Sequence, residues 1–197
     1  MRRLIRGLVL ALLAACSDNA GPTSQAPPVP ESQLHFVRQD PTAPPPAVLR
    51  DSFYAKVGEN RELRLDYQGG TEFFRFEVPS DGLFRRPGGA LFQPGDSILI
   101  VVTITDPKLF VVDFQPTGLQ FNPSDPARLK VYYYYADHDF NGDGRIDSTD
   151  AAIETKLDLW RREPPDTVWF SLGAVNFQSS EELDAKISSF TDHAVAW

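Results

Sequence analysis

The 197-residue sequence predicts a mainly β protein, an antiparallel β-sandwich with one inserted loop and one short helix. The first observation is the strict polar–apolar alternation of Arg61–Tyr67, which would turn its three apolar side chains to one face. The second is a series of short β-branched and aromatic runs separated by Gly, Pro, Asn and Asp. The third is that helical periodicity stands out at one place, directly after an Asp-rich stretch at 139–150.

The N-terminal residues predict the signal sequence of a lipoprotein. Three arginines lie among the first six residues, and 8–15 is an apolar run too short to span a bilayer as a helix. The run ends in Leu-Ala-Ala-Cys at 13–16, which matches the lipobox of bacterial lipoproteins. The alternative is an ordinary secretory signal with an incidental cysteine. We therefore expect removal of residues 1–15, acylation of Cys16, and a lipid-anchored protein of the bacterial cell envelope, either periplasmic or on the cell surface.

Residues 16–47 are predicted to form a Pro-rich tether between the anchor and the globular domain. This segment holds eight of the 17 prolines and few large apolar residues, a composition that favours an extended spacer. Leu34, Phe36 and Val37 form a small apolar island in it, which an added edge strand would explain. The β-sandwich domain is then expected over residues 48–197.

The charge balance argues against polyanionic partners. The formal charge is −8, and removal of the three signal arginines would take it to −11. Such an acidic chain is a poor candidate for binding nucleic acid or anionic lipid headgroups. Membrane contact is therefore expected through the lipidated Cys16 alone.

Further strands follow from the apolar pattern of the chain. In Thr71–Val78, Phe74, Phe76 and Val78 would share one face. The continuous apolar run Ile98–Ile104 suits a central strand that is covered on both faces. The remaining predicted strands are 109–114, 119–121, 128–135, 167–172, 183–190 and 194–197.

The most specific motif is the twelve-residue stretch D-F-N-G-D-G-R-I-D-S-T-D at 139–150. Oxygen-bearing side chains fall at positions 1, 3, 5, 9 and 12, and position 7 offers its backbone carbonyl, as in an EF-hand calcium loop. Gly144 allows the sharp turn at position 6, and Ile146 at position 8 would anchor the loop to the fold. A solvated acidic turn is the alternative interpretation. The predicted Ca²⁺ ligands are Asp139, Asn141, Asp143, Arg145, Asp147 and Asp150.

Gly142 at position 4 and an Asp at position 12 make this loop similar to the dockerin variety of EF-hand. A β-branched, aromatic run precedes the loop where an EF-hand would have its entering helix. After the loop, Ile153, Leu157 and Trp160 recur on one face of a predicted helix. The insertion at about 137–162 thus resembles one dockerin half-motif. Dockerins carry two such repeats and bind cohesins, so attachment to a cohesin-type partner is an alternative function.

A second resemblance concerns the sandwich itself, over about residues 68–197. Its motifs are Gly89-Ala90-Leu91 before a strong strand, Leu129–Tyr133 after an F-x-P turn, Trp-x-x-Leu at 169–172 and the closing segment 188–197. Together they resemble the ZU-five type of β-sandwich, whose members serve as adaptor or interaction modules. Some members cleave themselves at His-Phe-Ser. The matching positions here are Ser189, Phe190 and Thr191, so a serine replaces the histidine that would act as base.

Other catalytic motifs are absent from the sequence, including Gly-x-Ser-x-Gly, His-Glu-x-x-His and a phosphate-binding loop. The run Tyr132–Tyr135 could present one pair of alternate tyrosines to sugar rings, or bury its rings in the core. We therefore expect a non-enzymatic, calcium-stabilised interaction or structural module with a protein or glycan partner. The alternatives are the dockerin-like attachment module and an enzyme of unrecognised type.

Overall fold

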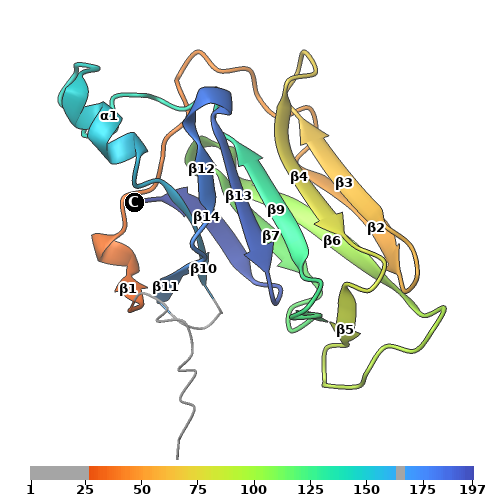
Figure 1. The fold of residues 1–197 in the computed structure, drawn as a ribbon. Coiled ribbons are helices and arrows are strands. Elements are labelled where there is room, and N and C mark those ends of the chain that lie inside the picture. The colour runs from red at the N-terminus through yellow and green to blue at the C-terminus, as the bar shows by residue number, and fades with distance from the viewer. Residues whose placement is uncertain (1–26, 163–166) are drawn as a thin grey trace, which may run out of the picture.

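The computed structural model describes residues 27–162 and 167–197 (Figure 1). The predicted signal sequence and Cys16 lie outside these residues. Two antiparallel sheets pack face to face in the described part, which confirms the predicted mainly β sandwich. Within the same residues, no helix has the length and apolar character needed to cross a membrane.

Among the described residues, seven strands form the larger sheet and five form the smaller one. In spatial order, the larger sheet contains β1 (Val29–Pro30), β11 (Val168–Ser171), β10 (Asp158–Arg162), β14 (Asp192–Ala196), β7 (Val111–Gln115), β6 (Ser97–Asp106) and β2 (Arg50–Lys56). The smaller sheet contains β12 (Val175–Phe177), β13 (Glu182–Ile187), β9 (Ala127–Tyr132), β4 (Glu72–Val78) and β3 (Arg61–Asp66). A separate ribbon pairs β5 (Leu83–Arg85) with β8 (Gln120–Phe121). The helix α1 is Ser148–Glu154, and short 3-10 turns occupy Glu31–Gln33, Pro107–Leu109 and Gln178–Ser180.

The core between the two sheets is built largely from phenylalanine rings. Phe76 on β4 contacts Phe114 on β7 with ring centroids 5.1 Å apart. Phe190 lies 5.0 Å from Phe114 and 5.0 Å from Phe121, so rings from both sheets and the ribbon meet in one cluster. All four side chains are buried. Aromatic pairs of this kind contribute about 0.5–1.5 kcal/mol each beyond the area that they bury.

Alternation predicts the inward residues of β3 and β4 correctly but not the environment of β6. Ile100, Val102 and Ile104 are buried, whereas Leu99 is 41% exposed. The prediction that this run is covered on both faces is therefore wrong. The reason is its place in the sheet: β6 lies one strand from the edge, and its outer face carries Leu99 beside the exposed Tyr54 of β2.

The described part of the predicted tether lies against the sandwich. Val29–Pro30 pairs with β11, and Val37 is fully buried, with its N–H donating to the Val195 carbonyl (3.0 Å). Further along, the Ala47 N–H donates to the Asp66 carbonyl (2.8 Å). We call residues 29–47 the N-terminal strap. The structure thus differs from the predicted tether over this segment, because its few apolar side chains find partners in strands that are distant in sequence.

The helix after the Asp-rich loop is shorter than predicted. It ends at Glu154, Leu157 is buried in the following turn, and Trp160 lies on β10 opposite Ala194 of β14. The prediction that Ile153, Leu157 and Trp160 share one helix face is therefore wrong. Pairing with β14 on one side and β11 on the other gives residues 158–162 a strand conformation, since sheet contacts override a helical pattern of this length.

Candidate functional site

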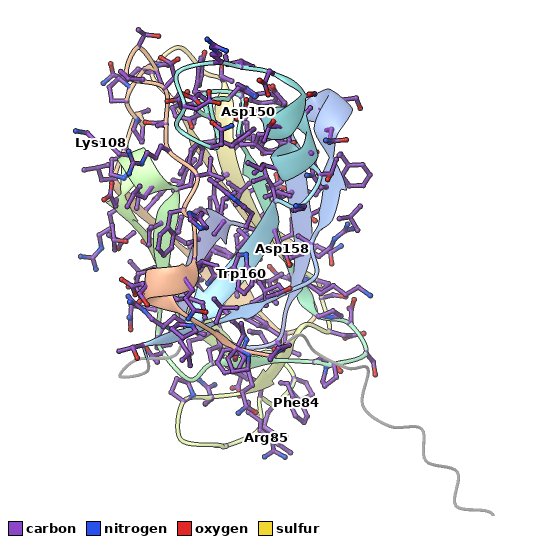
Figure 2. All side chains as sticks on the ribbon, turned by 90° about the vertical axis from the view of Figure 1, so that its left-hand side faces the viewer. Phe84, Arg85, Lys108, Asp150, Asp158 and Trp160 are labelled. Carbon is purple, nitrogen blue, oxygen red and sulfur yellow. The ribbon has the colours of Figure 1, made fainter. Side chains whose placement is uncertain are left out.

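The loop at 139–150 lies at one end of the sandwich, where Asp150 is labelled in Figure 2. Its anchor to the fold is Phe140, a buried ring that contacts the Trp197 ring edge-on, with centroids 5.9 Å apart. Ile146, predicted to be the apolar anchor, is 73% exposed, so that prediction is wrong. The second residue of the loop therefore packs against the sandwich, and the eighth lies in solvent.

In the first half of the loop, acidic and amide side chains accept hydrogen bonds from the backbone that follows them. Asp139 Oδ1 accepts from the Asp143 N–H (3.0 Å), and Asp139 Oδ2 accepts from the Gly144 N–H (2.7 Å). Asn141 Oδ1 also accepts from the Asp143 N–H (2.8 Å), and Asp143 Oδ1 accepts from the Arg145 N–H (2.9 Å). Gly144 has φ of 82°, which a side chain would oppose. The loop therefore curls around its own oxygen-bearing side chains.

The second half of the loop is joined to helix α1 through a capping box. Asp147 is the N-cap, and its Oδ1 accepts from the Thr149 N–H (2.7 Å). Asp150 Oδ2 accepts from the Asp147 N–H (2.9 Å), and Asp150 Oδ1 accepts from the Asn141 N–H (3.1 Å). These backbone donors hold the pKa of the Asp150 carboxyl below its ordinary value, and the Asp147 N–H has the largest effect. Asp150 thus joins the two halves of the loop.

All six predicted calcium ligands lie on this loop, but their side chains are not gathered around one point. Among the described residues, no three His, Cys, Asp or Glu side chains form a group that could hold a metal ion. The carboxylates are engaged with backbone N–H groups instead. The donor set nevertheless suits Ca²⁺, because carboxylate, amide and carbonyl oxygens are hard ligands and each retains a further lone pair. The chemistry and the backbone turn fit the ion, and closing the coordination shell would require the side chains to turn.

The structure also ties the end of helix α1 to the smaller sheet, through Tyr133 of the tyrosine run and through Asn176, which the sequence does not single out. Tyr133 is fully buried, and its hydroxyl donates to Asn176 Oδ1 (2.9 Å), with Glu154 Oε1 at 3.2 Å. The Asn176 amide in turn donates to the Glu154 carbonyl (2.6 Å). Burial raises the pKa of the Tyr133 hydroxyl, so it remains a donor at any ordinary pH.

The tyrosine run leaves its strand sooner than predicted, because β9 ends at Tyr132 and residues 134–135 lie in a turn. Tyr133 is fully buried, and Tyr135 contacts Tyr67 with ring centroids 4.8 Å apart. Tyr132 and Tyr134 stack on each other with centroids 5.4 Å apart. Tyr134 is 37% exposed and Tyr132 is buried, so this pair offers a ligand little more than one ring.

The residues that match the self-cleavage motif lie directly before β14. Thr191 is buried, and its hydroxyl donates to the Arg162 carbonyl. His193 Nδ1 lies 2.9 Å from the Thr191 carbonyl oxygen, and its Nε2 is buried without a hydrogen-bond partner among the described residues. No described base contacts the Thr191 hydroxyl, so the geometry offers nothing that would activate it.

No protein-family model, curated protein or solved structure matches this chain. The resemblances to dockerins and to the ZU-five sandwich therefore stay predictions.

Proposed function

We propose that this chain is a membrane-anchored lipoprotein of the cell envelope whose β-sandwich is a calcium-stabilised, non-enzymatic interaction module. The loop at 139–150 carries this proposal. Its six oxygen donors follow the EF-hand spacing, its backbone already curls around Asp139, and its ends are tied to the fold by Phe140 and Asp150.

Calcium would supply the positive charge needed to offset the carboxylates of this loop. Asp139, Asp143, Asp147 and Asp150 bring four carboxylates into twelve residues, and like charges at such spacing repel each other. Asn141 and the Arg145 carbonyl would complete the oxygen set. Sites in extracellular modules bind calcium with Kd on the order of 10⁻⁴ M. Free calcium at about 100 times Kd would stabilise the folded chain by about 2.7 kcal/mol.

The anchor follows from the lipobox at residues 13–16. Because the N-terminal strap begins at Val29, the spacer between Cys16 and the sandwich is residues 17–28. A fully extended chain of that length reaches about 40 Å. A spacer of this length would hold the module closer to the membrane than the predicted 16–47 tether.

Thermal unfolding with and without calcium tests the proposal, using the chain with Cys16→Ser to prevent acylation. We expect calcium to raise Tm by about 5–10 °C relative to EGTA, and magnesium to raise it much less. Asp139→Ala should abolish the calcium effect.

The matched control for that variant is Asp81→Ala. Asp81 is exposed, and its carboxylate makes no hydrogen bond within the described residues, so this variant should keep the full calcium response. An identical Tm in calcium and in EGTA would refute the calcium part of the proposal.

A further inference from the structure

We propose that the cavity beside the calcium loop binds a neutral saccharide. The cavity has a volume of about 400 Å³, within the range of small-molecule sites. Four segments that are distant in sequence line it: the N-terminal strap, Leu109, residues 137–142 at the start of the loop, and Trp197. Figure 1 shows the same convergence, with the C-terminal end beside the strap and below α1.

Aromatic rings form one wall of this cavity. The His35 and Trp197 rings stack with centroids 5.3 Å apart and an interplanar angle of 19°, and Phe140 contacts Trp197 edge-on. Two backbone hydrogen bonds hold the stack in place, from the His35 N–H to the Trp197 carbonyl (3.3 Å) and from the Trp197 N–H to the His35 carbonyl (3.1 Å). The C–H face of a sugar ring is weakly positive, so it packs well against such electron-rich rings.

Polar groups with unused hydrogen-bonding capacity line the cavity as well. The Arg38 guanidinium is exposed and makes no ion pair or hydrogen bond with any described residue. Asp137 Oδ1 accepts from the Asp139 N–H (3.1 Å), and Asp137 Oδ2 has no partner in the described chain. A guanidinium donates to hydroxyl oxygens and a carboxylate accepts from hydroxyl hydrogens. Together the two groups suit a ligand that both donates and accepts.

The charge balance selects a neutral ligand over a charged one. With calcium in the loop, the charge of Asp139 is compensated, and the cavity retains one positive group, Arg38, and one negative group, Asp137. An ammonium ligand would be attracted by Asp137 and repelled by Arg38, and an anionic ligand the reverse, so neither sign of charge gains a net attraction. An ion would still lose hydration on entering the cavity, a cost that a hydroxyl-rich neutral ring does not bear.

This inference rests on the proposed function, because the calcium loop forms part of the cavity wall. Its test is isothermal titration of the calcium-loaded Cys16→Ser chain with cellobiose, maltose, lactose and N,N′-diacetylchitobiose, and with galacturonic acid and lysine as charged probes. We expect at least one neutral disaccharide to bind with Kd at or below about 1 mM, and neither charged probe to bind comparably.

Two variants locate the site. Arg38→Ala and Asp137→Asn should each weaken disaccharide binding about tenfold or more, which corresponds to about 1.4 kcal/mol. Arg85→Ala is the matched control, because Arg85 lies at the opposite end of the molecule from Asp150 (Figure 2) and its guanidinium donates to the Gly89 carbonyl (3.0 Å). This control should bind as tightly as the parent chain. Calcium titration of each variant reports whether the loop is intact.

The titrations distinguish failure of the saccharide inference from failure of the proposed function. Calcium binding without disaccharide binding up to about 10 mM overturns the saccharide inference and leaves the proposed function standing. Absence of calcium binding overturns the proposed function itself. Disaccharide binding that neither variant weakens places the ligand elsewhere and overturns the site. Preferential binding of galacturonic acid or lysine overturns the charge argument.

Discussion

The core between the sheets and the loop at 139–150 are held together by different forces. In the core, Phe76 and Phe114 are buried among other rings, so apolar burial stabilises this region at any calcium concentration. In the loop, Asp139 and Asp150 bond to backbone N–H groups, and Ile146 leaves its apolar surface in water. The two regions should therefore respond to different perturbations, and five experiments address that difference.

The largest expected effect is in the core. Phe76→Ala removes a ring that contacts Phe114, Phe121 and Phe190, so it should lower the free energy of unfolding by about 3–5 kcal/mol. Urea denaturation followed by fluorescence measures this. Tyr54→Ala, at a ring that is 63% exposed, should stay within about 0.5 kcal/mol of the parent. A loss at position 76 below 1 kcal/mol would contradict this account of the core.

The next effect is a pH dependence that arises at the edge of the core. Burial lowers the pKa of His193 to about 3, whereas the unfolded chain has the ordinary value near 6.5. Between these values the unfolded state binds a proton that the folded state does not. Keeping His193 neutral in the folded state therefore costs no stability above about pH 6.5. Below that pH, it lowers the free energy of unfolding by about 1.4 kcal/mol per pH unit as the pH drops toward 3. His193→Gln should give a shallower decline when denaturation midpoints are compared at pH 7, 5 and 4; an equal slope in both chains would refute this assignment.

Calcium removal should separate the two regions most clearly. EGTA should increase hydrogen exchange of the α1 amides by about 100-fold at saturating calcium, since about 2.7 kcal/mol of local stability is lost. Amides of β4 that pair with β9 and open by local fluctuation of the sheet, without releasing calcium, should quicken far less. Mass spectrometry of exchanged peptides measures both regions in one sample. Equal changes in α1 and β4 would mean that the loop and the sheets unfold as one unit.

A smaller effect is expected where the two regions meet. Tyr133→Phe removes the hydroxyl that donates to Asn176 and leaves the buried ring in place, so it should cost about 1–2 kcal/mol. Its influence should appear in α1 before it appears in β4. Thermal unfolding gives the total, and exchange at α1 shows its location. Tyr54→Phe offers a matched control, because the Tyr54 hydroxyl makes no hydrogen bond within the described part of the chain.

The smallest effect is expected at Ile146. Because this side chain is 73% exposed, Ile146→Ser should change the free energy of unfolding by no more than about 0.5 kcal/mol. Phe140→Ser, at the buried neighbour in the same loop, should cost several times more. Chemical denaturation in calcium compares the pair. A large loss at Ile146 would restore the sequence-based prediction that position 8 anchors the loop.

Local pattern accounts for the parts of the fold that were predicted correctly. The inward faces of β3 and β4 follow from a two-residue period that any half-buried strand must show. The loop at 139–150 could be located because its Asp, Asn and Gly residues stand at fixed offsets. Strand β10 could not be predicted. Leu157, just before it, and Trp160, within it, are spaced as on one face of a helix, and the sequence alone did not favour a strand there.

The sequence by itself determined the β-sandwich class, the inward faces of the main strands and the oxygen-rich loop. These features depend on residues close to one another in the chain. Only the tertiary structure decided that the strap packs on β14, that Phe140 and not Ile146 anchors the loop, and that Arg38, Asp137 and Trp197 line one cavity. Each of those contacts joins residues far apart in sequence, and which distant side chains meet depends on how the two sheets pack.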